Sequence, residues 1–402
     1  MHDLLSKLFE MTAFGGITFK IVLMWTIAFI LLYLGIKKKY EPLLLVPIAF
    51  GVLLANFPGA GMGIVGAENI ELEGGRYKNL IEIAHEYGIL NYLYYALIKT
   101  GFLPPIIFMG VGALTDFGPM LRNLRLAFFG AAAQIGIFTV MIFAMLLGFD
   151  IKEAASLGII GGADGPTAIY TTIKLAPHLL GPIAIAAYSY MALVPVIIPL
   201  VANLLMTKKE FLINMKQMDK QFPAKHTIKN LKTVKIVFPI AMGTIISIFV
   251  PSAVPLLGML LFGNLVKEIG TSTNRLADAA TGPILNTATI FLGLAVGATM
   301  TSEVFLTQKT LGIVVGGFIA FAISIAGGIV AVKIYNLFAQ KKINPLVGAT
   351  GLSAVPMASR VANEMAIKHD PQNHILQYCM ASNISGVIGS AVAAGVLISL
   401  TM

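Results

Sequence analysis

The stretch Gly158–Thr171 reads GIIGGADGPTAIYT and holds one carboxylate, Asp164, among glycines and a proline. Asp164 is the only charged residue in the apolar run from Ala155 to Ile173. Glycine and proline at this density break a helix, because glycine loses much backbone entropy and proline lacks the N–H group. A charge within a membrane segment costs about 2.5 kcal/mol or more, so it usually has a function there. The pattern indicates an unwound segment that offers a carboxylate and freed carbonyl oxygens to a cation.

A Gly-rich turn of a soluble protein, with the aspartate as a helix cap, is the alternative, and the composition argues against it. Of the 402 residues, 57% are hydrophobic and 12% are charged, and the mean hydropathy is +0.85. Soluble domains carry about 25% charged residues, so these charges could not cover a soluble surface. We therefore predict an all-α polytopic membrane protein. The net charge of +9 then reflects lysines in cytoplasmic loops rather than a nucleic-acid-binding surface.

Apolar stretches separated by polar loops predict the membrane spans. They are Ile17–Ile36, Pro42–Asn56, Gly101–Phe117, Leu126–Gly148, Pro182–Met206, Ile236–Leu265 (cut by prolines), Pro283–Met300, Leu311–Val332 and Ile375–Met402. The positive-inside rule places Lys37–Lys39 in the cytoplasm. Counting spans from there, the eight-lysine loop Thr207–Lys235 is also cytoplasmic only if Ala155–Lys174 enters the membrane and returns on the same side. We therefore predict that Ala155–Lys174 is a re-entrant hairpin.

Asn344–Glu364 is a second broken segment, and Gly348-Ala-Thr-Gly351 within it is similar to Gly162-Ala-Asp-Gly165 in the first. Each segment lies between two uncharged spans, and the span count has them enter from opposite membrane faces. This order predicts two inverted repeats with a site at the bilayer midplane, on a scaffold with a mobile core.

The predicted organisation has five parts. They are 1–125 (N-terminal spans, scaffold and interfacial helices, beginning with an amphipathic helix at Met1–Phe14), 126–206 (first repeat core, with hairpin 155–174), 207–235 (basic cytoplasmic loop), 236–310 (middle spans) and 311–402 (second repeat core, with hairpin 343–366).

Oxygen-bearing side chains that could complete a site lie in the second broken segment and on the neighbouring spans. The candidates are Asn344, Gly348 (through its backbone), Thr350, Ser353, Ser189 and Asn383. Such hard ligands suit Na⁺ rather than a transition metal, although Ser, Thr and Asn also join helices in membranes. Tyr190 either makes a hydrogen bond through a buried hydroxyl or relays a proton. Arg360 either extends toward the lipid headgroups or binds an anion.

Four motifs in this order carry a resemblance: GGADGPTAIY, AAYSYMALVP, NPLVGATGLSAVPMASRVAN and ASNISGVIGSAVAAG. Together they resemble the beta subunit of the sodium-pumping biotin-dependent decarboxylases, whose members act on oxaloacetate, methylmalonyl-CoA, glutaconyl-CoA or malonate. The resemblance covers most of the chain. It implies a subunit of the bacterial cytoplasmic membrane that decarboxylates carboxybiotin, consumes an external proton and exports Na⁺.

The resemblance also implies roles for individual residues. The essential aspartate of the family matches Asp164, its tyrosine matches Tyr190 and its arginine matches Arg360, which we expect to be catalytic, with Arg360 facing carboxybiotin. The other residues that match the family are Asn344, Gly348, Ser353 and Asn383. We expect these four at the sodium site with Asp164, together with Thr350 and Ser189.

The partners implied are a carboxyltransferase subunit, a biotin carrier and a small membrane-anchor subunit of the gamma or delta type, with a trimer of this chain as the family assembly. Biotin itself is expected on the carrier. Met215-Lys216-Gln217-Met218 is only an imperfect match to a biotin-attachment sequence, in a lysine-rich loop. The alternative function is a stand-alone Na⁺-coupled carboxylate transporter of elevator type, which would use Asp164 and Arg360 as ion and substrate ligands.

Overall fold

The computed structural model describes residues 12–39, 41–72, 76–222, 230–354 and 357–402. Most of the amphipathic helix predicted for Met1–Phe14 lies outside these residues. Within them the chain is helical apart from one short antiparallel pair, β1 (Glu71–Leu72) and β2 (Arg76–Tyr77). The described residues contain seven helices long and apolar enough to cross a membrane, or up to nine if two bent helix pairs each form a span. The predicted all-α polytopic class is therefore confirmed.

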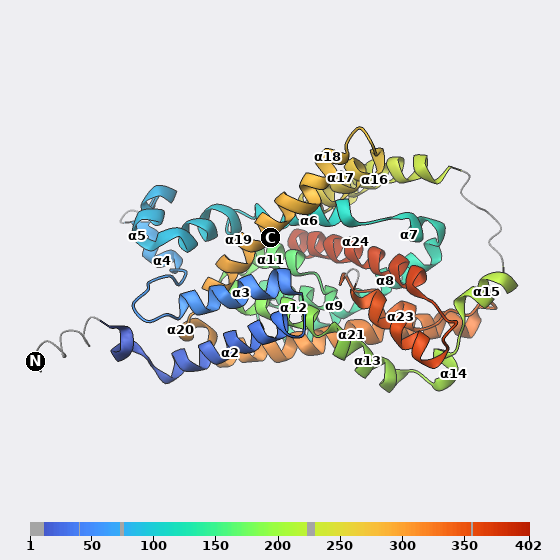
Figure 1. Ribbon diagram of the computed structural model, residues 1–402, viewed down its shortest axis with the longest axis horizontal. Coiled ribbons are helices and arrows are strands. Elements are labelled where there is room, and N and C mark those ends of the chain that lie inside the picture. Colours follow the sequence, from blue (N-terminus) through green and yellow to red (C-terminus); the bar gives the residue numbers. More distant parts are fainter. Residues whose placement is uncertain (1–11, 40, 73–75, 223–229, 355–356) are drawn as a thin grey trace, which may run out of the picture.

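The N-terminal helices pack against a helix from the middle of the chain (Figure 1). α2 (Phe19–Ile36) lies against α3 (Pro42–Ala55), which in turn lies along α19 (Leu285–Ala298). Glycines permit this close approach, because a Cβ atom at Gly51 of α3 would lie 3.0 Å from the Cα atom of Gly297 in α19. Apolar side chains of these helices form one of two hydrophobic cores.

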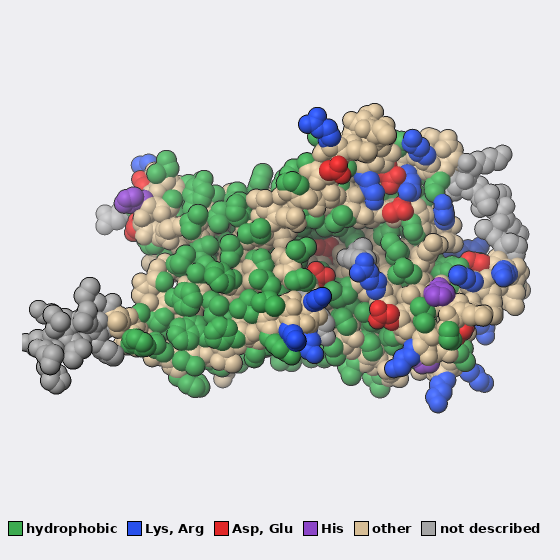
Figure 2. Space-filling model, viewed as in Figure 1, with side chains coloured by type: hydrophobic (Ala, Val, Ile, Leu, Met, Phe, Trp, Pro, Cys, Tyr) green, Lys and Arg blue, Asp and Glu red, His purple; other side chains and the backbone are tan. Residues whose placement is uncertain are grey.

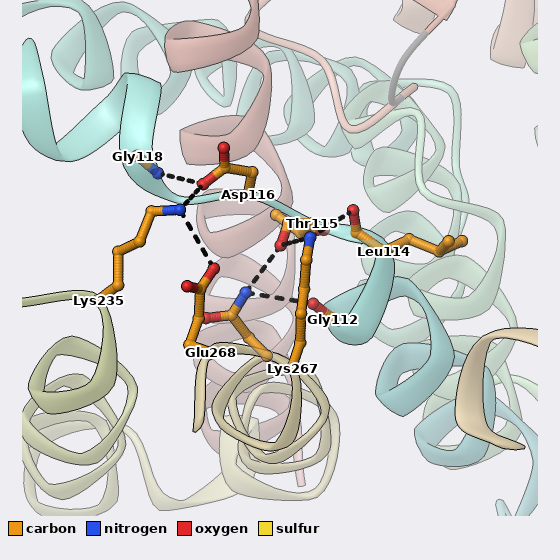
Figure 3. Close-up of polar contacts among 9 residues, drawn as sticks. Gly112, Leu114, Thr115, Asp116, Gly118, Lys235, Lys267 and Glu268 are labelled. Carbon is orange, nitrogen blue, oxygen red and sulfur yellow. Dashed lines mark hydrogen bonds and ion pairs between the residues drawn. The ribbon is translucent and has the colours of Figure 1, made fainter. Parts of the chain in front are cut away.

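The pair α6 (Leu103–Leu114) and α17 (Val254–Ile269) also packs closely, and polar contacts fix one end of it (Figure 3). The buried amide of Asn264 on α17 donates from Nδ2 to the carbonyl oxygens of Gly112 and Thr115, at 3.3 and 2.8 Å. Asn264 thus binds two carbonyls at the C-terminal end of α6, where helical carbonyls begin to lack backbone partners.

An ion-pair cluster joins this end of the pair to α16 (Leu231–Phe249). Lys235 Nζ lies 2.5 Å from an Asp116 carboxylate oxygen and 3.4 Å from one of Glu268 (Figure 3). Partial burial alone would raise the pKa of Asp116, but the Lys235 ammonium and the N–H of Gly118 hold that pKa below its usual value. Three helices are thus tied together where they leave the apolar region.

Two pairs of short helices interrupt the pattern of long ones, at the two broken segments of the sequence. The first pair lies between α9 and α12 and the second between α21 and α24. The helices of this region are α8 (Leu124–Ala133), α9 (Ile135–Leu146), α10 (Ile151–Gly158), α11 (Gly165–Leu175), α12 (Leu180–Ala192), α13 (Val194–Leu205), α21 (Gln308–Phe338), α22 (Leu346–Ala349), α23 (Met357–His369) and α24 (Leu376–Thr401). They supply most of the second hydrophobic core.

The first segment doubles back on itself, and we name residues 151–178 hairpin 1. Glu153, near the start of α10, accepts a hydrogen bond of 2.8 Å from Nε2 of His178, which follows the end of α11. α10 and α11 also contact each other. The chain therefore leaves hairpin 1 beside the point where it enters.

The second segment closes in a similar way, and we name residues 344–373 hairpin 2. Its first and last residues, Asn344 and Asn373, are buried, and their Nδ2 atoms donate to the same two backbone carbonyls. Those carbonyls belong to Phe211 and Ile213, in the loop after α13. One short stretch of backbone thus holds both ends of hairpin 2.

The span predicted for Pro182–Met206 is not straight. Its helices, α12 and α13, are bent by 69° relative to each other at the break around Leu193. Pro195 lies in the first turn of α13, where the missing N–H and the proline ring favour the start of a new helix over the continuation of α12.

Positive charge gathers at one end of the molecule. In Figure 2 most lysine and arginine side chains lie on the right-hand half, where Figure 1 shows α14 (Lys208–Phe211), α15 (Met215–Gln221) and α23. Hydrophobic side chains cover much of the left-hand half. The positive-inside rule assigns the basic end to the cytoplasm.

The remaining short elements connect these helices. They are η1 (Ala13–Gly16), α4 (Ala67–Ile70), α5 (Leu80–Leu93), η2 (Tyr94–Ile98), α7 (Gly118–Arg122), η3 (Ile159–Gly162), η4 (Pro177–Leu179), η5 (Pro251–Ala253), α18 (Asn274–Ala279), η6 (Ala280–Ile284) and α20 (Ser302–Phe305).

Candidate functional site

The tips of the two hairpins meet inside the protein. The backbone N–H of Ser353, at the tip of hairpin 2, donates to the carbonyl oxygen of Gly162 at 3.0 Å. The Ser353 hydroxyl donates to Oδ2 of Asp164 at 2.8 Å. Two segments far apart in sequence therefore build one polar site where neither is helical.

Asp164 is the centre of this site and is only 4% exposed. It precedes α11 as the N-cap, and its Oδ1 accepts the N–H of Thr167 at 3.2 Å. Its Oδ2 accepts a second hydroxyl, that of Ser390 on α24, at 3.0 Å. The preceding residue, Ala163, has a left-handed backbone with φ of 55°, which costs a non-glycine residue about 1 kcal/mol or more. The chain keeps this strained turn where it aims the carboxylate between the hairpins.

The negative charge of Asp164 forms no ion pair with a cationic side chain in the described part of the chain. Among the described residues, none of the ion pairs includes Asp164, and its contacts are two hydroxyls and one backbone N–H. An ionised carboxylate in a dry interior is unfavourable unless it is paired. Binding of either a metal cation or a proton would remove that penalty.

Further oxygen atoms surround the hairpin tips without hydrogen-bond partners. Gln134 Oε1, Thr167 Oγ1, Tyr188 Oη and Asn383 Oδ1 are all buried and lack partners within the described part of the chain. Tyr188 packs directly over Gly165, where a Cβ atom would overlap its ring. Such a set of carboxylate, hydroxyl and amide oxygens is suited to a hard cation such as Na⁺.

Of the residues proposed from sequence, the structure brings Ser353 and Asn383 to Asp164 or its surroundings. Ser353 touches the carboxylate directly. Asn383 Nδ2 donates to the carbonyls of Thr350 and Leu352, at 3.2 and 2.5 Å, and so supports the tip of hairpin 2 from α24. The Thr350 hydroxyl itself points away from the carboxylate, to backbone carbonyls including that of Cys379.

Asn344 and Gly348 lie elsewhere. All of the amide of Asn344 is used at the start of hairpin 2, because Nδ2 binds the two loop carbonyls and Oδ1 accepts the N–H of Leu346. Gly348 packs its backbone against that of Gly328 on α21. Both residues seat hairpin 2, and the structure does not bring either one to Asp164.

Tyr190, Ser189 and Arg360 are also apart from the carboxylate contacts. The Tyr190 hydroxyl donates to the carbonyl of Val314 on α21, and Ser189 is half-buried on α12 without a contact to Asp164. The tyrosine beside Asp164 is Tyr188, two residues earlier. Arg360 is exposed on α23, the helix that leaves the tip of hairpin 2.

Sequence reasoning missed three residues of this site: Ser390, Tyr188 and Gln134. Ser390 follows Asn383 by two helical turns, so the spacing alone placed both on one face of α24. Tyr188 lies in the quoted YSY motif, but nothing in the sequence selected it over Tyr190. The sequence also offered a signal for Gln134, because it is the only amide side chain in the uncharged span predicted for Leu126–Gly148.

Comparison with known proteins agrees with a sodium site. Residues 20–401 match the family model described as the Na⁺-transporting oxaloacetate decarboxylase beta subunit. The chain belongs to this family. It is therefore a multi-pass membrane subunit of a Na⁺-transporting decarboxylase assembly. Membership of this family argues against the alternative function, a stand-alone transporter.

Individual relatives of this beta subunit are similar over nearly their whole length. The methylmalonyl-CoA decarboxylase subunit beta of Propionigenium modestum is 46% identical, covering 98% of each chain. The oxaloacetate decarboxylase beta chain of Klebsiella pneumoniae is 42% identical, covering 94% of this chain and 95% of its own. A second methylmalonyl-CoA decarboxylase subunit beta, from Veillonella parvula, is 46% identical over 94% of this chain and 92% of its own.

Proposed function

We propose that this beta subunit decarboxylates carboxybiotin presented by a carrier subunit, and that the reaction drives Na⁺ out of the cell through the Asp164 site. The observation that carries the proposal is the buried Asp164 carboxylate at the meeting of the hairpin tips, with two hydroxyls and no cationic partner among the described residues. The side chains that contact it are hydroxyls, whose oxygen atoms suit a hard monovalent cation.

Na⁺ and a proton compete for this carboxylate. A charge of +1 beside the Asp164 oxygens satisfies the carboxylate, and a second positive charge at the same place would be repelled strongly in a medium of low dielectric constant. Protonation therefore displaces Na⁺, and the reverse also holds. In the proposed cycle Na⁺ enters from the cytoplasm, and a proton from outside releases it outward.

The proton is then used by the decarboxylation. The bond between the biotin nitrogen and the carboxyl carbon breaks, CO₂ leaves, and the electron pair stays on the nitrogen, which takes up one proton. The basic end of the molecule suits the approach of the negatively charged carboxybiotin (Figure 2). Exposed Arg360, on the helix that leaves the tip of hairpin 2, is the cation we assign to its carboxylate.

The arrangement of the hairpins supports an inverted repeat. The ends of hairpin 2 lie against the loop after α13, at the basic end, whereas α12 and α13 separate that loop from the ends of hairpin 1. We infer that the hairpins enter from opposite sides and meet at their tips, as in transporters with a midplane site. We extend the proposal to a mobile core, a trimer, and partners of carboxyltransferase, biotin-carrier and small anchor type.

The proposal is tested with free carboxybiotin and the purified decarboxylase complex, with and without Na⁺. We expect turnover that requires Na⁺ and saturates with its concentration. A proteoliposome assay with ²²Na⁺ should show transport only while carboxybiotin is consumed. Turnover at the same rate in Na⁺-free buffer would reject the coupling.

Arg360→Ala should weaken the carboxybiotin step selectively. Loss of a charged hydrogen bond typically costs about 1.5–3 kcal/mol, so KM for free carboxybiotin should rise roughly tenfold to a hundredfold. The Na⁺ concentration for half-maximal activity should change little, because Arg360 makes no contact with Asp164. Equal losses in both quantities would count against this role, and Arg360→Lys should recover part of the KM.

A further inference from the structure

Gln134 occupies an unusual place in the core, between the two hairpins. It lies at the junction of α8 and α9 and is 5% exposed. Its Nε2 atom faces three backbone carbonyls, those of Gly130, Gly351 and Gly386, at 3.0, 3.2 and 3.4 Å. One of these carbonyls, Gly351, belongs to the tip of hairpin 2, so the side chain reaches the non-helical part of the site.

The contacts of Nε2 fix the direction of the Gln134 oxygen. If the amide were turned over, Oε1 would face three carbonyl oxygens, which are all acceptors and would repel it. Oε1 therefore points the other way, and there it is buried and has no partner within the described residues. A buried acceptor without a partner loses the hydrogen bonds it would make in water, so this oxygen favours a further ligand.

The Gln134 oxygen points toward the tip of hairpin 1. A Cβ atom placed on Gly162 would lie 3.5 Å from Gln134 Oε1 and 2.9 Å from the Cβ atom of Ser390. Ser390 is one of the two serines that bind the carboxylate of Asp164. Gln134 also packs against Gly389, the residue beside Ser390 on α24. The amide oxygen, the serine and the tip of hairpin 1 thus share one small region.

We propose that Gln134 is a ligand of the transported Na⁺, with its amide oxygen binding the ion beside the Asp164 carboxylate and the Ser390 hydroxyl. This proposal rests on the sodium site proposed above. An amide oxygen is a hard, neutral ligand, so it adds coordination without a second negative charge that would hold the ion too tightly for release. The Nε2 contacts position that oxygen against the tip of hairpin 2.

Other buried amides share part of this pattern, and one of them serves as a control. Asn264 also donates from its amide nitrogen to two backbone carbonyls and has an oxygen without a partner within the described residues. It lies between α6 and α17, and among the described residues neither hairpin nor any carboxylate takes part in its hydrogen bonds. Asn264→Leu therefore removes a similar amide without changing the proposed ion site.

The test is equilibrium binding of ²²Na⁺ to the purified decarboxylase complex, compared with its thermal unfolding. Gln134→Met keeps the length of the side chain and removes its oxygen, so it should weaken Na⁺ binding by about tenfold or more. Gln134→Glu loses the same N–H donors but keeps an oxygen that can bind the ion, so its Na⁺ affinity should stay above that of Gln134→Met. Asn264→Leu should bind Na⁺ as the wild type does.

The outcomes separate the two proposals. If the wild-type complex binds no Na⁺, or Asp164→Asn binds it normally, the proposed sodium site fails. If the wild type binds Na⁺ through Asp164 and Gln134→Met binds it equally well, only the role of Gln134 is overturned. Equal losses in Gln134→Met and Gln134→Glu would assign the effect to the lost N–H contacts and would also overturn the role as a ligand.

Discussion

Asp164→Asn should abolish Na⁺ transport and Na⁺-dependent decarboxylation together. The variant keeps the shape of the side chain and loses its charge. An ion pair at about 4 Å is worth about 4 kcal/mol at an effective dielectric constant of 20, so Na⁺ should bind roughly a thousandfold more weakly. The variant also removes the group that accepts the competing proton. Both activities should therefore fall to background in the ²²Na⁺ and carboxybiotin assays.

An exposed aspartate supplies the matched control. Asp278 lies at the surface on α18, so Asp278→Asn should transport and decarboxylate as the wild type does. Asp164→Asn should remain folded, because the asparagine oxygen can still accept from Ser353 or Ser390. If decarboxylation in Asp164→Asn still responded to Na⁺ at wild-type concentrations, the carboxylate would not be the ion ligand.

Gly348→Ala should unseat hairpin 2 and with it the site. Gly348 on α22 faces Gly328 on α21 backbone to backbone, and a Cβ atom at Gly348 would lie 2.5 Å from the carbonyl carbon of Gly328. Neither backbone can move aside as a side chain could, so the hairpin must shift. Overpacking of this kind costs about 3 kcal/mol or more. The purified chain should unfold at a lower temperature in detergent, and Ser353 should lose its position beside Asp164.

Gly316→Ala, on the neighbouring helix α21, is the control. A Cβ atom there would lie 3.8 Å from Leu157, an ordinary contact, and alanine favours a helix over glycine by about 1 kcal/mol. This variant should therefore unfold at the wild-type temperature or slightly above it. An unchanged unfolding temperature and full Na⁺-dependent turnover in Gly348→Ala would show that the close approach is not needed.

Several properties of this protein follow from sequence alone because they depend on composition or on local chemistry. The chain has too few charged residues to cover a soluble surface, so it must lie in a membrane. Asp164 stands out because it is the one charge in an apolar segment that glycine and proline break. Ser353 was also found from its position in the second Gly-rich segment. The bend between α12 and α13 was missed, although Pro195 offered a local signal for it.

Which side chains meet Asp164 was decided only by tertiary structure. Neighbouring positions on a helix point about 100° apart, so the choice between Tyr188 and Tyr190 depends on how α12 is rotated against its neighbours. Asn344 looked like an ion ligand, but backbone carbonyls 133 and 131 residues away in sequence take its amide. The positions of Ser390 and Gln134 in the site were also decided by tertiary structure, because hydrogen bonds between distant segments depend on packing that no local pattern encodes.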